Sequence, residues 1–281
     1  MSKIKKFWAL YSVAGGGEWD RCMYPARLDT YWQGCSHNCS YCYARALLDF
    51  RGLRHPENPK FIDLKEAYRI IAQEIPKGQI TRLGGMTDCF QPVEKVHKIT
   101  YNVLKAFNYY KKPYLIVTKS DLVATDEYIK VLDKDLAHIQ ITITSTNDEL
   151  ASTYEKATRP SDRIKAIEKL RSLWYDVQIR LSPYIPQYIE ISKINAIKCD
   201  KILVEFLRVN HWIKKRFNID YKDYTLNEGG YLHLPLEKKI QLISKITKPE
   251  ITVCEDVDEH YKYWKEHFNH NSEDCCNLRL K

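Results

Sequence analysis

The sequence predicts an α/β fold in which parallel strands alternate with helices along the chain. Short apolar segments of strand length recur, and amphipathic segments of helical length separate them. Such an alternation favours parallel pairing with right-handed crossover helices. Hydrophobic residues make up 44% of the 281 residues, which is enough for a sizeable core. We therefore expect a single α/β domain.

Six predicted strands with helices between them account for most of the chain. Each strand is a short apolar run that ends in polar or turn residues, and the six are expected at residues 28–33, 80–83, 114–118, 139–144, 177–181 and 201–207. The helices have apolar residues at helical spacing and are expected at residues 44–50, 64–75, 92–110, after 125, at 161–173 and at 190–198. Capping and breaking residues mark several helix ends: Asp63, Pro76, Gly78, Pro92, Thr125 and Ser161 or Asp162.

Three cysteines follow the first predicted strand within eight residues. Cys35, Cys39 and Cys42 have the spacing C-x3-C-x2-C, and Tyr41 directly precedes the third. They lie on a loop that leaves a strand, which is where barrel folds carry their chemistry. Three thiolates can hold three irons of a [4Fe–4S] cluster and leave the fourth iron open to another ligand. The spacing therefore favours an iron–sulfur centre with one accessible iron.

A zinc knuckle is the alternative that the same residues allow. His37 or a more distant residue would then complete the ligand set. Zinc sites of this type usually have a second spaced pair of ligands further along the chain. The later cysteines that lie together, Cys275 and Cys276, are direct neighbours and make a poor chelate. The iron–sulfur cluster is therefore favoured over zinc.

Composition restricts the compartment and the partners. The chain has nine cysteines, no secretory signal at its N-terminus and no apolar run of about 18 residues, which indicates a reducing cytoplasm and no membrane partner. The formal charge of +8 permits nucleic-acid binding, but the lysines are spread thinly through the chain. A basic enzyme with solvated lysines fits this composition equally well.

The cysteine spacing, with an aromatic residue before the third cysteine, resembles that of the radical S-adenosylmethionine (SAM) superfamily. The resemblance implies a partial (β/α)6 barrel and a [4Fe–4S] cluster on Cys35, Cys39 and Cys42, whose open iron binds SAM. One electron from the cluster then cleaves SAM to a 5′-deoxyadenosyl radical, which takes a hydrogen atom from the substrate. A flavodoxin or ferredoxin-type protein is the expected electron donor.

Within the expected barrel, residues 208–234 break the strand–helix rhythm. They are rich in Tyr, Asn and charged residues, and we expect them to form an insertion near the barrel mouth. A helix at 236–246, a strand at 251–254 and a helix at 258–267 follow. The single domain is thus divided into a lead-in (1–27), a barrel core (28–207) and a C-terminal extension that packs on the barrel mouth (208–281).

A closer resemblance, over roughly residues 28–207, is to the spore photoproduct lyase group. It rests on residues 39–44, on Thr118-Lys119 ahead of the Thr142 strand, and on a Thr-Asp-x-aromatic-Gln-Pro-x-Glu stretch at 87–94. The resemblance implies that Tyr41 and Tyr43 relay a hydrogen atom. The expected SAM-binding residues are Tyr41, Gly84, Gly85, Thr87, Lys119, Thr142 and Thr144.

One departure from that group concerns the hydrogen donor. Met86 stands where the lyase has a donor cysteine, and a thioether has no hydrogen to give. Cys89 can replace it only if the loop turns it inward, and a buried hydrophobic role is equally expected. Cys254 and Tyr43 are the other candidates. The sequence also has no clear counterpart of the lyase's DNA-gripping hairpin, so duplex DNA is an unexpected substrate.

A small modified nucleobase is the preferred substrate. A branch related to the lyase, queuine lyase, converts queuine to 7-aminomethyl-7-deazaguanine in queuosine salvage. Recognition requires an aromatic face, a carboxylate and polar groups, and residues of these types near the mouth are Tyr41, Tyr43, Glu205, Arg208, Asn210 and residues 254–256. Two other functions stay open: a DNA repair enzyme like spore photoproduct lyase, and a non-enzymatic zinc or iron–sulfur protein that binds nucleic acid.

Overall fold

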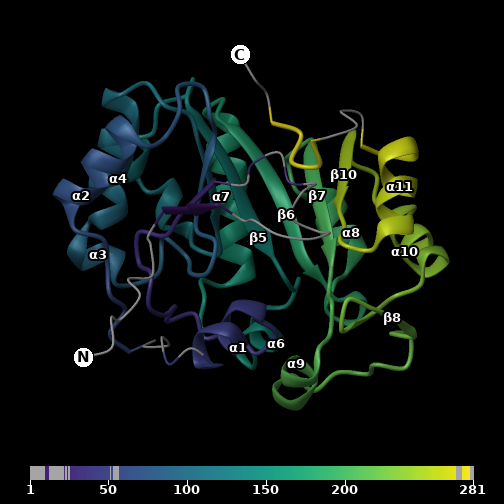
Figure 1. The fold of residues 1–281 in the computed structure, drawn as a ribbon. Coiled ribbons are helices and arrows are strands. Elements are labelled where there is room, and N and C mark those ends of the chain that lie inside the picture. The colour runs from purple at the N-terminus through teal and green to yellow at the C-terminus, as the bar shows by residue number, and fades with distance from the viewer. Residues whose placement is uncertain are drawn as a thin grey trace.

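The centre of the computed structural model is a curved eight-stranded sheet with helices on its outer face (Figure 1). The structure describes residues 10–12, 22, 24, 26–50, 52, 57–269 and 274–278. The strand order is β1-β2-β3-β4-β5-β6-β7-β10, and every neighbouring pair is parallel except β1 and β2. The predicted α/β fold with a parallel sheet is therefore confirmed.

The elements follow the predicted alternation. The strands are β1 (Leu10–Ser12), β2 (Ala26–Leu28), β3 (Thr81–Leu83), β4 (Tyr114–Thr118), β5 (Ala137–Ile143), β6 (Asp176–Tyr184), β7 (Lys201–Phe206), β8 (Leu226–Glu228), β9 (Tyr231–His233) and β10 (Glu250–Cys254). The helices are α1 (Tyr43–Phe50), α2 (Leu64–Gln73), α3 (Glu94–His97), α4 (Ile99–Tyr109), α5 (Asp126–Ile129), α6 (Asp148–Ser152), α7 (Pro160–Ser172), α8 (Ile191–Ala196), α9 (His211–Arg216), α10 (Leu236–Ile243) and α11 (Asp258–His267).

Two hydrophobic clusters lie on opposite faces of the sheet, because successive strand residues point to opposite sides. The outer cluster includes Ile116 of β4 and Phe107 of α4, and both are fully buried. The inner cluster includes Leu115 of β4 and Leu203 of β7. Residues 274–278 of the C-terminal tail supply Cys276 and Leu278 to this inner cluster, so the tail packs inside the curve of the sheet.

The first strand and one helix differ from the prediction. The strand predicted at 28–33 corresponds to β2, which lies earlier in the chain and ends at Leu28. The strand does not continue because, from Asp29 on, a side chain replaces the backbone as the partner of the β3 turn: the Asp29 carboxylate accepts a hydrogen bond from the Gly85 amide at 2.8 Å. The helix predicted at 92–110 is broken at Lys98, which has a left-handed φ of 52°. Glu94 explains the break, because its side chain accepts from the first amides of α4 at 2.9 Å.

The C-terminal extension enters the main sheet as well as covering it. Its strand β10 pairs in parallel with β7, and α10 and α11 lie on that flank (Figure 1). The hairpin β8–β9 was not predicted, although Gly229 and Gly230, with φ of 59° and 79°, are a usual signal for a two-residue hairpin turn. Most of the lead-in lies outside the described residues.

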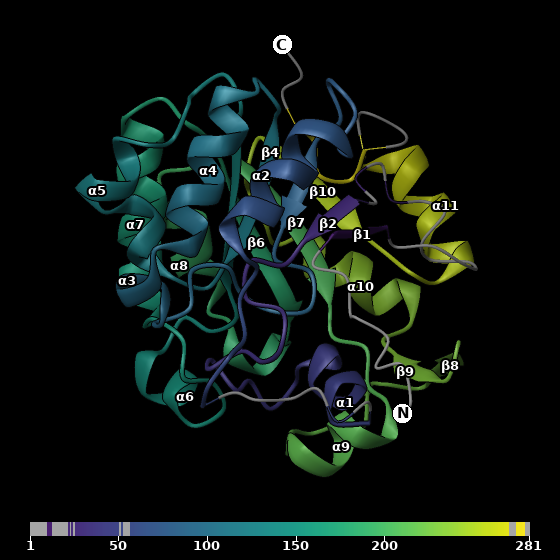
Figure 2. The same ribbon diagram turned by 60° about the vertical axis from the view of Figure 1, so that its left-hand side comes forward.

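One end of the molecule carries α1, α6 and α9 (Figure 2). This is the end at which the parallel strands finish, and the cysteine loop between β2 and α1 lies there. Within the described ranges, no helix combines the length and apolarity needed to cross a membrane.

Candidate active site

The cysteine loop is held by backbone hydrogen bonds, both within itself and to residues after α6. The Asn38 amide donates to the Cys35 carbonyl at 3.2 Å, and the Cys42 amide donates to the Cys39 carbonyl at 3.3 Å. The amide of Ser40 donates to the Tyr154 carbonyl at 2.8 Å. Cys39 is buried, and Cys35 and Cys42 are half-buried. The three thiols are therefore fixed by a compact loop beneath the protein surface.

Gln91 and Asp88 join this loop to the neighbouring strand ends. Gln91 is fully buried, and its side chain accepts from the Ser36 amide at 2.9 Å and donates to the Gly34 carbonyl at 3.2 Å. Asp88 accepts from the Thr118 hydroxyl and from the Lys119 amide, both at 2.7 Å. The predicted 87–94 stretch thus braces the cysteine loop against the end of β4.

Glu155 is the centre of a buried network on the other side of the loop. Its carboxylate pairs with Arg163 and accepts hydrogen bonds from the Tyr41 hydroxyl and, at 3.0 Å, from the Thr144 hydroxyl. Cys39 Sγ lies 3.9 Å from the same carboxylate. Burial opposes ionisation, but the charge of Arg163 keeps the pKa of Glu155 below its ordinary value. A permanent ion pair therefore supports the second cysteine.

The donor set fits an iron–sulfur cluster better than a zinc ion. Burial raises the pKa of Cys35 to about 12 and that of Cys39 well above its usual range, so bound metal must replace their protons. A zinc ion needs thiolates about 3.8 Å apart, given its short bonds to sulfur. Among the described residues, the Sγ atoms of the three loop cysteines do not all lie within 4.8 Å of one another. The same is true of any two of these Sγ atoms together with a ring nitrogen of His37. A cluster binds each thiolate to a separate iron and accepts this wider spacing.

The turn after β3 is built for close backbone approach. Gly84 has a φ of +84°, and a side-chain carbon there would lie 3.0 Å from the Thr87 carbonyl oxygen. The Gly85 carbonyl accepts a hydrogen bond from the Tyr43 hydroxyl at 2.9 Å. The structure therefore brings two of the predicted SAM-binding glycines next to a predicted relay tyrosine.

Lys119 lies beside the cysteine loop, as the resemblance implies. Its ammonium is 5.7 Å from the centre of the Tyr41 ring, and it forms no ion pair with any described residue. A cation in this position is suited to the carboxylate of a bound amino acid. Thr142 is buried on the neighbouring strand β5, one residue beyond Ile141, which pairs with Thr118. Its backbone carbonyl accepts from Arg163 at 2.9 Å.

Four predicted ligand-binding residues already have structural partners. The hydroxyl of Thr87 donates to the Tyr31 carbonyl, and those of Thr144 and Tyr41 donate to Glu155. The Asn210 side chain caps α9 by accepting from the Ile213 amide at 2.9 Å. These side chains shape the site, and their contact with SAM or substrate stays a prediction.

The C-terminal side of the mouth contains the predicted substrate residues. Arg208 Cζ lies 5.5 Å from the centre of the Tyr43 ring, and Arg208 donates to Asp256 at 2.8 Å. Glu205 pairs with Arg180 and accepts from the Ser182 hydroxyl at 2.8 Å. Burial opposes the ionisation of Glu205, but the charges of Arg180 and Arg208 lower its pKa to about 2. Glu205 is therefore a permanent carboxylate.

The hydrogen-donor candidates are separated by the structure. Cys89 has no exposed surface and belongs to the outer hydrophobic cluster, so its prediction as a small buried hydrophobe is the one that agrees with the structure. Cys254 is half-buried at the end of β10, directly opposite Glu205 in the strand register. Cys275 and Cys276 of the C-terminal tail belong to the same hydrophobic cluster as Cys254. The Asn277 side chain holds this tail by donating a hydrogen bond to the Glu250 carboxylate at 2.9 Å.

Several residues that organise the site had no signal in the sequence analysis. Asp29 accepts from the backbone of the β3 turn, and Glu155 with Arg163 supports the cysteine loop. Gln91 lies in the stretch used for the resemblance, but its contact with the loop was not foreseen. Tertiary contacts alone reveal these roles.

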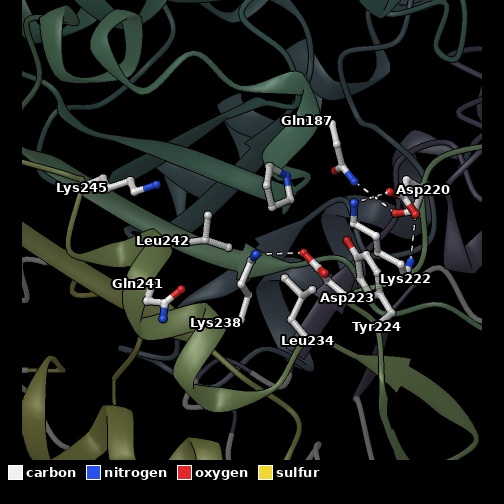
Figure 3. A pocket seen from close by; sticks show the side chains of 11 residues that line it. Gln187, Asp220, Lys222, Asp223, Tyr224, Leu234, Lys238, Gln241, Leu242 and Lys245 are labelled. Carbon is white, nitrogen blue, oxygen red and sulfur yellow. Dashed lines mark hydrogen bonds and ion pairs between the residues drawn. The ribbon is translucent and has the colours of Figure 1, made fainter.

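A hollow of about 350 Å³ lies on the surface between η3 (Pro186–Tyr188), the segment before β8, and α10 (Figure 3). Lys238 pairs with Asp223 across it at 2.9 Å, and the Gln187 side chain donates to the Asp220 carbonyl at 3.1 Å. None of the predicted site residues lines this hollow. It is therefore separate from the cysteine loop.

The chain is similar in sequence to known proteins. The profile of the Radical SAM superfamily matches residues 30–185, which is more than half of the chain. The uncharacterized protein MJ0683 of Methanocaldococcus jannaschii is 33% identical over 169 residues. That alignment covers 57% of this chain and 61% of the relative, so it spans less than two thirds of the relative's length.

Two solved structures resemble the fold. A spore photoproduct lyase mutant with bound AdoMet and dinucleoside spore photoproduct has a TM-score of 0.60 and 14% identity, covering 90% of this chain and 81% of its own. SuiB of Streptococcus suis bound to precursor peptide SuiA has a TM-score of 0.56 and 14% identity, covering 84% and 50%. At such identities the similarity shows the fold alone, and it confirms the partial barrel.

Proposed function

The chain belongs to the radical SAM superfamily, and on this premise we propose that it is a lyase that cleaves a small modified nucleobase. The superfamily's cofactors are a [4Fe–4S] cluster and SAM, which together supply a 5′-deoxyadenosyl radical for hydrogen abstraction. Queuine is the most specific candidate substrate, and 7-aminomethyl-7-deazaguanine is the corresponding product in queuosine salvage. We place this activity in the cytoplasm, where the cluster and its thiolates stay reduced.

The position of Tyr43 is the observation that carries the proposal. Its hydroxyl donates to Gly85, on the turn expected to bind the methionine amino group, and its ring lies near Arg208 on the opposite side of the mouth. The residue as a whole is 38% exposed, which leaves room for a base to stack on it. A tyrosine that connects the cofactor turn to polar mouth residues is suited to hold a base near the radical.

Other residues take roles that follow from their chemistry. Lys119 pairs with the methionine carboxylate, and Glu205 accepts hydrogen bonds from the guanine-like edge of the base. Cys254, whose residue lies opposite Glu205 in the sheet register, gives a hydrogen atom to the product radical and becomes a thiyl radical. One electron from the flavodoxin or ferredoxin-type donor and one proton then restore the thiol. Tyr43 is the alternative donor for the same step.

The hairpin β8–β9 does not favour duplex DNA as the substrate. The hairpin β8–β9 carries Glu228 and has no Lys or Arg between Leu226 and His233. DNA-binding elements depend on such cations for phosphate contacts. A repair enzyme like spore photoproduct lyase is the second candidate, and the similarity of the fold is what favours it.

Helix α9 is the proposed docking surface for an acidic electron donor of the flavodoxin or ferredoxin type. Arg216 donates to the backbone carbonyl of Cys42 at 3.4 Å, so the helix touches a cluster ligand. Lys214, Lys215 and Trp212 are exposed on the same helix. Basic side chains around an exposed aromatic residue complement an acidic protein and place it next to the cluster loop.

Turnover after anaerobic reconstitution tests the proposed function. The protein is incubated with SAM, a reductant and either queuine or ultraviolet-irradiated DNA, and 5′-deoxyadenosine and the base product are measured by mass spectrometry. We expect 5′-deoxyadenosine to rise with queuine, together with 7-aminomethyl-7-deazaguanine. Stimulation by irradiated DNA alone would replace this proposal with repair, and a cluster without SAM cleavage would indicate a binding protein.

A further inference from the structure

Among the residues that the structure describes, the charged groups inside the barrel mouth are unequal in number. Four guanidinium groups, those of Arg27, Arg82, Arg180 and Arg208, surround the region of Tyr43 and β10. Two described carboxylates face them: Glu205 pairs with Arg180, and Asp256 pairs with Arg208. Arg82 and Arg27 therefore have no described carboxylate partner.

Arg82 is held in place by its strand and not by a counterion. Its Nε donates to the Gly84 carbonyl at 3.0 Å, and it forms no ion pair with any residue that the structure describes. Arg27 lies directly opposite it in the register of β2 and β3, so both side chains leave the same face of the sheet. Arg27 donates to the Tyr24 carbonyl at 2.7 Å and to Cys22 Sγ at 3.4 Å, and not to a carboxylate.

Two neighbouring cations on one face of a sheet repel each other, and Arg82 is half-buried, so solvent screens its charge only in part. Burial, followed by the charges of Arg27 and Arg180, lowers the pKa of Arg82 from its ordinary value. The structure keeps this arrangement next to the predicted cofactor turn, where a ligand can supply the missing negative charge.

The thiol of Cys276 is a separate sign of the same positive potential. It belongs to the inner cluster, with the tail held in place by the hydrogen bond of Tyr24 to Asp274 at 2.6 Å. A hydrogen bond with Cys275 and, against the effect of burial, the charges of Arg180 and Arg82 lower the pKa of Cys276 to about 7. The two arginine charges add to the larger effect of the Cys275 hydrogen bond, in the direction that favours an anion at this position.

We infer that Arg82 and Arg180 form an oxyanion subsite inside the barrel, so that the substrate, or the molecule that carries the base, has a phosphate or carboxylate group there. This inference rests on the proposed function only for the identity of the base. Lys119 lies near Tyr41 and Glu155 and is the cation assigned to the methionine carboxylate. The subsite is therefore assigned to a second anion, which would bind beside the turn that is expected to hold the methionine amino group.

Calorimetric titration of the cluster-loaded protein with SAM tests the subsite without requiring turnover. Guanosine and guanosine 5′-monophosphate share one base and differ by a phosphate. We expect the monophosphate to bind at least about tenfold more tightly, as a charge-assisted hydrogen bond to the half-buried guanidinium of Arg82 implies. Competition by inorganic phosphate or by acetate then distinguishes a phosphate from a carboxylate subsite.

Variants locate the effect. Arg82→Gln should remove most of the preference for the monophosphate and leave guanosine binding unchanged, whereas Arg82→Lys should keep part of it. Arg69→Gln, on the exposed face of α2, is the matched control and should keep the full preference. Equal binding of the two ligands by the parent protein would overturn the subsite, as would a full preference in a folded Arg82→Gln variant.

Failure of the subsite and failure of the proposed function give different results. A preference for the phosphate without cleavage of queuine would support the subsite and contradict queuine as the substrate. Cleavage of queuine without a preference for the phosphate would support queuine as the substrate and contradict the subsite.

Discussion

Glu155 connects the cysteine loop, β5 and α7 through a single buried carboxylate. Arg163 supplies its counterion, and Tyr41 and Thr144 supply hydrogen bonds. Both charged side chains are almost completely buried, at 0% and 1% exposure. When one partner of such a pair is removed, the other is left as an uncompensated buried charge.

Replacing Glu155 by Gln should therefore be costly. We expect the free energy of unfolding to fall by about 3–5 kcal/mol, and iron incorporation to fall with it. Urea unfolding of the apoprotein measures the first quantity. The control is Glu190→Gln, which breaks an exposed pair with Lys193 and should leave the stability almost unchanged. Equal losses in both variants would contradict the role of Glu155.

Asp176 gives a prediction for acid stability. It pairs with His138 at 2.6 Å and with Lys201 at 2.9 Å. Burial opposes the ionisation of Asp176, but these two partners lower its pKa to about 2. The ordinary Asp pKa is about 3.9, so this group stabilises the fold by roughly 2 kcal/mol above that pH and loses the effect as the pH falls towards 2.

The measurement for Asp176 is urea unfolding between pH 5 and pH 2.5. We expect Asp176→Asn to be less stable than the parent at pH 5 and the difference to shrink as the pH falls. Glu149→Gln, at an exposed position, should leave the pH dependence unchanged. A difference that grows on acidification would show that the pairing of Asp176 is not what stabilises the fold.

The turn after β3 is an element whose backbone sets the site. Gly84→Ala combines the strain of a positive φ, about 1–2 kcal/mol, with contacts at 3.0 and 3.2 Å to two backbone carbonyls. Gly78 has a similar φ of +81°, but a side-chain carbon there would meet no atom within 4 Å. Gly78→Ala therefore has the backbone strain of a positive φ without the close contacts. We expect Gly84→Ala to lose more stability, by urea unfolding, and also to bind SAM more weakly. Equal losses, with SAM binding intact in both, would contradict this account of the turn.

Helix α9 is the element that the account assigns to electron transfer. We expect the Lys214→Glu, Lys215→Glu double variant to accept electrons from an acidic donor protein at least about tenfold more slowly at low salt. SAM cleavage with dithionite should be unchanged, because dithionite needs no docking surface. The control, Lys130→Glu with Lys134→Glu, makes the same charge change before β5, at the far end of the sheet. Equal slowing of electron transfer by the two double variants would contradict α9 as the docking surface.

Elements with strong local signals were predicted well. The strand predicted at 114–118 is β4 without change, and Asp63 caps α2 by accepting from the Glu66 amide at 3.1 Å. The break at Lys98 was missed because the side chain that caps α4, Glu94, also bonds Tyr31 and Tyr128 in the core. Such a break depends on tertiary contacts and leaves no periodicity in the sequence.

At the scale of the whole molecule, the sequence located the cysteine loop and the strand ends but not how they are fastened together. Short-range spacing was enough for Cys35, Cys39 and Cys42, and for the glycine turn after β3. The pairing of Glu155 with Arg163 and the packing of the tail beside Cys254 join segments far apart in sequence. No local pattern reports contacts of this kind.

The metal content of protein purified without oxygen tests the central claim most directly. We expect about four irons per chain and SAM-dependent formation of 5′-deoxyadenosine. Both should be lost when Cys35, Cys39 or Cys42 is replaced by Ala. One zinc per chain with no iron, or 5′-deoxyadenosine formation that survives any of these three substitutions, would contradict it.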